Sequence, residues 1–216
     1  MEKLVSKLKK VEYGHLFWGP YVMRTLVPDY IIKRLLKDGK EKLKSYHKKL
    51  AGHVKSQLLY NIDTINWFYK ETTPIWNAYR EGHCKYHNLD NIQVELSAHD
   101  LWVNFMKAGD FNPIHTHGGD YSFVLFLDIP DKLVKEAKDF EGTSAKPGSL
   151  MFEFTQQAQP RYATTGHNIL PKRGEMFIFP AMLQHWVCPF KSKVTRISVS
   201  GNMEIMNKKK LPHGYF

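Results

Sequence analysis

The sequence has few cysteines and no long apolar run. Its two cysteines, Cys84 and Cys188, do not form a CxxC motif. This gives no support to a disulfide framework or a cysteine zinc site, and it suits a reducing cytoplasm. The longest apolar stretches, such as residues 122–129, fall far short of the roughly 20 residues that span a bilayer, and lysines interrupt the N-terminus where a signal peptide would be apolar. We therefore expect a soluble, cytoplasmic protein.

Acidic residues are scarce near the N-terminus. The chain has 31 Lys and Arg against 21 Asp and Glu, a net charge of +10. Residues 1–50 hold 13 of the basic and 5 of the acidic residues, so +8 of that charge lies there. A basic surface attracts polyanions, and a nucleic-acid or partner-binding module is therefore one interpretation. No nucleic-acid-reading motif accompanies the charge, and most of the lysines fit the solvated faces of helices.

The N-terminal part shows one strand-like and two helical patterns. Residues 16–26 contain apolar and aromatic residues without helical spacing, which predicts a strand, and residues 31–36 repeat apolar positions at i and i+4, which predicts a helix. Residues 61–79 form a second helical face, in which Pro74 should kink or restart the helix. With 43% apolar residues in 216, the chain is long enough for one domain with a sizeable core.

After residue 90 the apolar period changes from that of a helix to that of a strand. Apolar and polar residues alternate over 92–97, and further strand-like runs are residues 101–106, 121–129, 149–154, 175–179 and 194–200. Between them, the polar and lysine-rich residues 131–148 predict a surface excursion. Many short strands separated by turns favour a mainly β jelly roll, that is, a cupin-like double-stranded β-helix. We expect this core to span residues 91–205, supported by an N-terminal strand and helices within residues 1–90.

Three histidines are candidates for one metal site. His115 and His117 lie two positions apart on extended chain, so their side chains point to the same side. His185 follows the strand-like residues 174–180 and can bring a third imidazole to the same point. Imidazole suits iron, zinc, copper and nickel alike. Asp120 competes with His117 for one ligand position, because iron(II) oxygenases commonly use two histidines and one carboxylate, but its offset of three residues favours His117.

Arg196 is the candidate anion-binding residue. Alternation over residues 194–200 places Arg196, Ser198 and Ser200 on one face of a strand. A buried arginine requires an anionic partner, and a dicarboxylate bound by the guanidinium and the Ser198 hydroxyl would supply one. The opposite register would leave Arg196 as a surface charge and bury Ile197 and Val199 instead.

These residues resemble a known pattern. His115-x-His117, then His185, ten residues, and Arg196-x-Ser198 is similar to the His-x-Asp, distal His and Arg-x-Ser pattern of the Fe(II)/2-oxoglutarate-dependent oxygenase superfamily. The segments around these residues are similar to members encoded by cyanobacterial phages, over roughly residues 95–203. The resemblance implies a double-stranded β-helix that uses Fe(II), 2-oxoglutarate and O2. It also implies that His117 stands where the superfamily has its carboxylate.

The function expected from this resemblance is a dioxygenase, by default a hydroxylase. Asn104, on the strand before the histidine pair, is a candidate hydrogen-bond partner of 2-oxoglutarate, although ordinary packing explains it equally well. The substrate is a small molecule, a peptide or a nucleic-acid component, a homodimer is possible, and the location is the host cytoplasm if the protein is phage-encoded. A cupin-type metalloprotein is the nearest alternative, but Tyr121 and Ser122 stand where a cupin requires glutamate.

Overall fold

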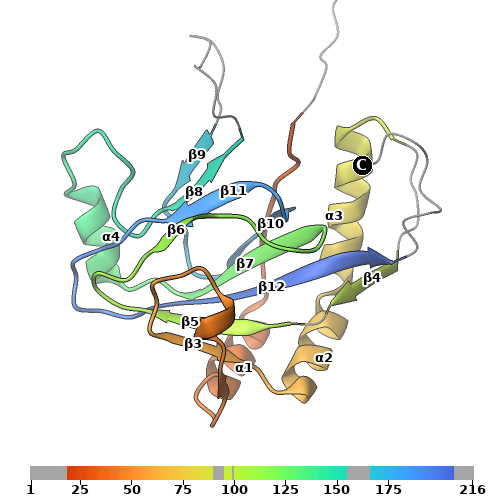
Figure 1. The fold of residues 1–216 in the computed structure, drawn as a ribbon, viewed down its shortest axis with the longest axis horizontal. Helices are drawn as coiled ribbons and strands as arrows, with labels where there is room; N and C mark the ends of the chain where they lie inside the picture. Colours follow the sequence, from red (N-terminus) through yellow and green to blue (C-terminus); the bar gives the residue numbers. More distant parts are fainter. Residues whose placement is uncertain (1–18, 90–94, 99, 155–165, 207–216) are drawn as a thin grey trace, which may run out of the picture.

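The computed structural model describes residues 19–89, 95–98, 100–154 and 166–206, which form two β-sheets and several helices (Figure 1). The large sheet contains β1 (Met23–Leu26), β2 (Lys44–Ser45), β3 (Ser56–Leu59), β4 (Glu95–Ala98), β5 (Trp102–Met106), β7 (Tyr121–Asp128), β10 (Glu175–Pro180) and β12 (Arg196–Met206). The small sheet contains β6 (Asn112–His115), β8 (Leu150–Glu153), β9 (Gly166–Ile169) and β11 (Gln184–Val187). The first residues of the strands expected at 16–26 and 92–97 lie outside the described residues.

The order of strands confirms a mainly antiparallel β architecture. The large sheet runs β1-β10-β7-β12-β5-β3-β2, with β4 also paired to β12, and the small sheet runs β6-β11-β8-β9. In Figure 1 the small sheet lies above the large one, while α1 and α2 lie below it. Strands β1 and β3 come from the N-terminal part of the chain and pair with β10 and β5. The N-terminal segment therefore contributes strands as well as helices to this framework.

The helices begin and end where local sequence signals predict. Helix α1 (Asp29–Asp38) follows Pro28 and ends at Gly39. The helical pattern of residues 61–79 divides into α2 (Ile62–Glu71) and α3 (Thr73–Tyr86), with Pro74 in the first turn of α3, so the predicted restart is confirmed. Among the described residues, no helix combines the length and apolar character needed to span a bilayer.

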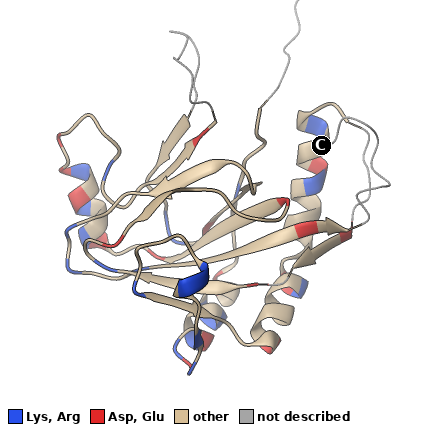
Figure 2. Ribbon diagram, in the orientation of Figure 1, with Lys and Arg blue, Asp and Glu red and all other residues tan. Residues whose placement is uncertain are grey.

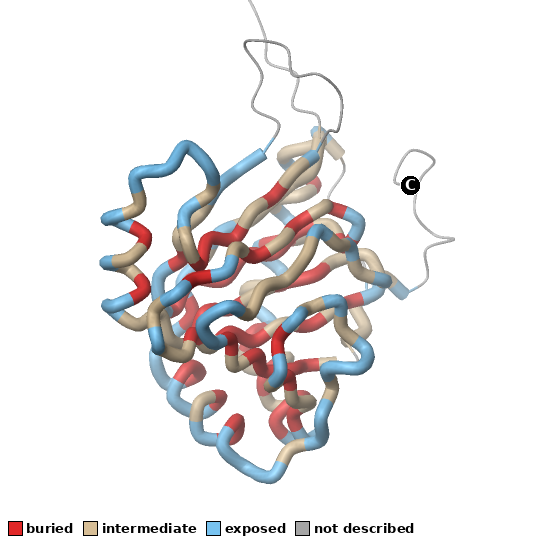
Figure 3. Tube along the Cα trace, turned by 60° about the vertical axis from the view of Figure 1, so that its left-hand side comes forward, coloured by how far each residue is buried: buried red, intermediate tan, exposed pale blue. Residues whose placement is uncertain are grey.

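Both faces of the large sheet are covered. In β7, Leu125 and Leu127 belong to an apolar cluster with the helices, whereas Phe126 points to the other side and joins a cluster shared with the small sheet. The same alternation holds in β10, where Ile178 packs toward the helices and Phe177 toward the small sheet. Figure 3 shows buried residues concentrated in the interior of the molecule and exposed residues around its outside. A polar side chain on the inner face is therefore removed from bulk water.

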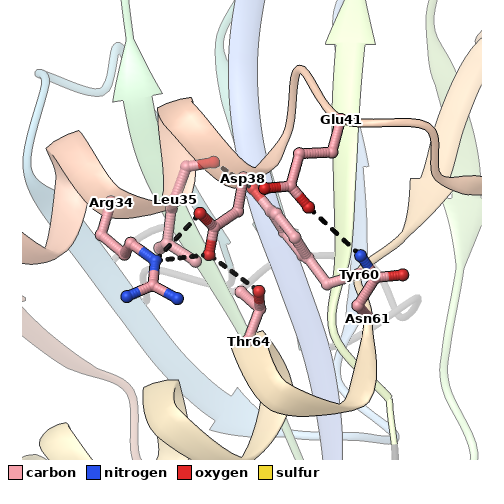
Figure 4. Close-up of polar contacts among 7 residues, drawn as sticks. All are labelled: Arg34, Leu35, Asp38, Glu41, Tyr60, Asn61 and Thr64. Carbon is pink, nitrogen blue, oxygen red and sulfur yellow. Dashed lines mark hydrogen bonds and ion pairs between the residues drawn. The ribbon is translucent and has the colours of Figure 1, made fainter.

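A buried carboxylate ties α1 to α2 (Figure 4). The Arg34 Nε donates to both oxygens of Asp38 at 2.9 and 2.7 Å, and the Thr64 hydroxyl donates to Asp38 Oδ2 at 2.8 Å. Nearby, the Tyr60 hydroxyl donates to the Leu35 carbonyl oxygen at 2.9 Å. These bonds hold the helices against the sheet in a fixed position.

The segment expected as a surface excursion, residues 131–148, lies largely at the surface, and its first half is helical. Helix α4 (Asp131–Lys138) occupies it, and buries Leu133 and Ala137 at i and i+4 against the cluster between the sheets. Glu136 accepts hydrogen bonds from the backbone N–H groups of Lys191 and Ser192, at 2.8 and 2.7 Å. The helix therefore packs against the loop that leads into β12.

Candidate active site

The three candidate histidines meet at one point. His115 ends β6 and pairs directly with His185 of β11 across the strands, and His117 follows two residues after His115. The ring centroids of His115 and His185 are 4.2 Å apart, and His117 lies 4.9 Å from each. One ligand nitrogen from each ring lies within 4.8 Å of the other two. The three side chains could therefore hold a single metal ion.

Backbone carbonyls orient two of the rings. His115 Nδ1 donates to the Pro113 oxygen at 2.7 Å, and His185 Nδ1 donates to the Leu183 oxygen at 2.8 Å. Because Nδ1 then carries the proton, the Nε2 lone pairs are free for a metal, as in many metal sites. His117 Nε2 and His185 Nε2 are 3.1 Å apart. Two nitrogens bound about 2.1 Å from one ion at right angles are roughly 3.0 Å apart, so the donor set fits an octahedral metal such as Fe(II).

Burial keeps these imidazoles neutral. It lowers the pKa of His117 to about 4 and that of His185 to about 3, with a further lowering by the neighbouring His115. The pKa of His115 is also lowered by burial. Only neutral imidazole coordinates a metal, so the cluster is in its binding form at neutral pH.

Asp120 lies outside the cluster because its loop is attached to β12. Asp120 Oδ2 accepts a hydrogen bond from the Ile205 backbone N–H at 2.7 Å, and the Asp120 N–H donates to the Met203 oxygen at 2.9 Å. Gly119 precedes it with φ of 89°, and a Cβ there would lie 2.9 Å from the Met203 oxygen. The glycine allows the close turn that carries Asp120 toward β12.

Arg196 is a buried cation without an anionic partner among the described residues. Its relative exposure is 2%, and its Nη1 donates weakly to the Met106 sulfur at 3.3 Å and to the Gly148 oxygen at 3.4 Å. The guanidinium also lies over the Phe126 ring, 4.8 Å from its centroid, while its Nε has no hydrogen-bond partner. Burial lowers the pKa of Arg196 to about 10. A buried arginine in such surroundings is arranged for an anionic ligand.

A row of polar side chains crosses three neighbouring strands beside this arginine. Gln57 of β3, Asn104 of β5 and Ser198 of β12 are in register. Gln57 Nε2 donates to Asn104 Oδ1 at 2.8 Å, and Asn104 Nδ2 lies 3.5 Å from the hydroxyls of Ser198 and Ser200. Gln57 Oε1 is buried and has no partner.

One cavity brings all six predicted site residues together. It is lined by His115, His117, His185, Asn104, Arg196 and Ser198. Sequence reasoning missed Gln57 and Asn112, which also line it. It missed as well that residues 50–54, between η1 (His47–Lys49) and β3, form one wall. No residue of the lining is an aspartate or a glutamate.

The core of the chain matches an enzyme family. Residues 100–202 match a family model described as "Putative 2OG-Fe(II) oxygenase". This segment contains the three histidines, Arg196 and Ser198. No curated protein matches the chain.

Solved structures share the fold at low sequence identity. A Pseudomonas putida prolyl-4-hydroxylase has a TM-score of 0.52 and 14% identity, covering 86% of this chain and 92% of that one. The viral collagen prolyl hydroxylase of Paramecium Bursaria Chlorella virus-1, in complex with 2-oxoglutarate, has a TM-score of 0.51 and 16% identity, covering 85% and 95%. The non-heme α-ketoglutarate-dependent epimerase SnoN has a TM-score of 0.55 and 12% identity, covering 86% and 78%.

The fold and the site together define a double-stranded β-helix protein with a cluster of three histidines that could hold a metal. Within that class, the family match and the shared fold support the 2OG-Fe(II) oxygenase superfamily. Enzymes of this family use Fe(II), 2-oxoglutarate and O2, and the histidine cluster suits such a metal. This outcome favours the oxygenase interpretation over the cupin-type and nucleic-acid-binding alternatives.

Proposed function

We propose that the protein is an Fe(II)- and 2-oxoglutarate-dependent hydroxylase in which His115, His117 and His185 hold the metal. The observation that carries the proposal is the buried, unpaired Arg196, which lines the same cavity as the three histidines. A metal alone would not require this arginine. A metal together with a dicarboxylate accounts for both the histidine cluster and the buried arginine.

The co-substrate contacts follow from the position of the arginine. Arg196 binds the distal carboxylate of 2-oxoglutarate through its guanidinium, and the Ser198 hydroxyl donates to the same carboxylate. Asn104, only 8% exposed and held by Gln57, lies next to Ser198 and fixes its hydroxyl or contacts the co-substrate directly. The carboxylate then compensates the Arg196 charge, and its hydrogen bonds to water are replaced by hydrogen bonds from the guanidinium and the Ser198 hydroxyl.

His117 changes the charge of the site. In a site of two histidines and one carboxylate, the carboxylate offsets one of the two positive charges of Fe(II). Three neutral imidazoles leave both charges, so with dianionic 2-oxoglutarate and Arg196 the closed site carries a net charge of about +1. Asp120 supplies no compensating charge there, because its carboxylate binds the β12 backbone.

The chemistry follows from these contacts. Fe(II), when bound, couples O2 to the oxidative decarboxylation of 2-oxoglutarate and to oxidation of a substrate C–H bond. The chain's own residues position the reactants: Arg196 and Ser198 fix one end of the co-substrate, and the three histidines would hold the metal that binds the other end. The apolar walls from Val187, Phe179 and Leu150 exclude water.

Anaerobic titration with Fe(II) and 2-oxoglutarate tests the proposal. Wild-type protein should develop a visible charge-transfer band only when both are present. The band should be weaker in Arg196→Met, because this variant binds 2-oxoglutarate poorly. In His117→Ala the band should be absent. Asp120→Asn is a matched control, because the amide oxygen still accepts from the Ile205 N–H. Loss of the band in Asp120→Asn with retention in His117→Ala would assign the third ligand to Asp120, and stoichiometric metal binding without a band would refute the oxygenase assignment.

The reaction outcome and organisation are part of the same proposal. Hydroxylation predicts that the product gains one oxygen atom, whereas an epimerase product would not, so mass spectrometry of the product separates the two. We also propose the division into a supporting region, residues 1–90, and a catalytic core, residues 91–205. The closer relation to cyanophage oxygenases, the host cytoplasm as location and the homodimer stay predictions.

A further inference from the structure

One wall of the cavity, beside β6, is formed by a basic segment. Residues 42–55, which we call the lysine strap, contain five lysines and two histidines and no aspartate or glutamate. Leu50, Gly52 and Val54, in its second half, line the cavity, and its lysines are exposed. Figure 2 shows η1, in the middle of the strap, as a blue turn at the front of the molecule.

The lysine strap is held against the cavity near its C-terminal end. The His53 N–H donates to the Phe111 oxygen at 2.8 Å, and the two rings stack with centroids 4.6 Å apart. A Cβ on Gly52 would lie 2.1 Å from Asn112 Oδ1, so only glycine lets the strap approach β6 this closely. The strap is therefore a fixed boundary of the site, and a substrate that enters the cavity contacts it.

The positive charge of the strap is not balanced by the protein. No ion pair recorded among the described residues involves a strap lysine, and the only recorded charge contact is Lys49 over the Tyr46 ring, 5.5 Å from its centroid. The cavity lining contains no acidic residue either. Since the occupied metal site would itself retain a positive charge, cavity and rim share one sign. We propose that the substrate is an acidic peptide segment that binds along the lysine strap, an inference that rests on the proposed function.

Two features favour a peptide over a nucleic acid. Single-stranded nucleic acids bind exposed aromatic rings on which bases stack, but Lys49 covers Tyr46, Trp102 is 3% exposed, and the strap has no arginine. Conversely, β6 is an end strand of the small sheet: in the described part of the chain it pairs with β11, and the strap bridges Phe111, just before β6 begins. Its Ile114 is 56% exposed, directly beside His115. An unpaired strand edge beside an apolar side chain is a surface to which an extended peptide adds as a further strand.

Fluorescence anisotropy on the anaerobic protein loaded with Fe(II) and 2-oxoglutarate tests this inference. The probes are a labelled polyglutamate peptide of about 20 residues, a polyglutamine peptide of equal length and an oligothymidylate of similar charge. The strap variant is Lys48→Glu/Lys55→Glu. The matched control is Lys132→Glu/Lys138→Glu, which makes the same change in net charge on α4. The charge-transfer band is recorded for every variant.

We expect wild-type protein and the α4 variant to bind polyglutamate in preference to the other probes, and the strap variant to bind it at least about tenfold more weakly, with its band unchanged. Equal weakening in both variants would reduce the effect to general charge and overturn the inference, as would tighter binding of oligothymidylate. Absence of polyglutamate binding with an intact band overturns the inference alone. Absence of the band in wild type overturns the proposed function and this inference with it.

Discussion

Replacing Arg196 with methionine should make the ligand-free protein more stable and should remove its ability to bind 2-oxoglutarate. The lowering of the Arg196 pKa to about 10 corresponds to about 3 kcal/mol of unfavourable free energy for keeping the charge in the folded state, at roughly 1.4 kcal/mol per pKa unit. Methionine has a similar volume and no charge. It forfeits the contact over the Phe126 ring, which contributes about 1 kcal/mol. The net expectation is a stabilisation of about 2 kcal/mol, or roughly 4–8 °C in Tm for a chain of this size.

Thermal and urea denaturation of the metal-free protein measure this effect. Adding Fe(II) and 2-oxoglutarate anaerobically at 100 times Kd should stabilise wild type by about 2.7 kcal/mol, and 2-oxoglutarate should add nothing to Arg196→Met. Arg196→Lys retains a charge without the planar fork, so it should resemble wild type in ligand-free stability but bind 2-oxoglutarate more weakly. If Arg196→Met loses 1 kcal/mol or more in the ligand-free state, the arginine is a structural residue and the reasoning fails.

Three further outcomes test the framework around the site. Burial, and then His87, lowers the pKa of His83 to about 4, so the unfolded chain binds a proton that the folded chain does not between about pH 6.5 and 4. The free energy of unfolding should therefore decrease as the pH is lowered from about 6.5 to 4. In urea titrations His83→Phe should reduce this decrease; an unchanged dependence of stability on pH would contradict the assignment. Asp38→Ala should cost about 2–4 kcal/mol, since Thr64 loses its acceptor, and Asp38→Asn should cost less; equal losses would argue against the network. Gly52→Ala should cost about 1–3 kcal/mol by calorimetry, because its methyl group displaces the amide it touches on β6; a neutral effect would show that the strap can yield.

The alternation in β12 predicted which residues share a face but not which face is buried. The alternation was interpreted as one buried and one solvated face, so either Arg196 or Val199 could be on the buried side. In the structure Arg196 and Val199 are both buried, at 2% and 0% exposure, since helices cover one side and the small sheet the other. The grouping of Arg196 with Ser198 is therefore confirmed. The covering layers could not be deduced from the strand itself, because they come from distant segments of the chain.

Other features differed in the local signal they carried. Gln57 faces the cavity only because β3 pairs with β5, and nothing in its own neighbourhood marks a buried glutamine. Helix α4 did carry a signal, since Leu133 and Ala137 have the i, i+4 spacing of a helix, but the many lysines around them led to the interpretation as a surface excursion. The histidine cluster was foreseeable because His115 and His117 are close in sequence and because His185 follows the strand-like residues 174–180. The position of Asp120 depends on a turn at Gly119 whose direction the sequence does not specify.

Iron availability should set the shape of one edge of the molecule. Strand β6 is joined to β11 by only two registered pairs, His115 with His185 and Asn112 with Val187, and the pairing shifts between them. A metal held by His115 and His185 would link β6 to β11 and stabilise this short ladder. Without iron, we expect the β6 amides to exchange with solvent first, so that an iron-starved cell would contain a protein whose peptide-facing edge is loosened. Metal supply would then govern substrate capture as well as chemistry.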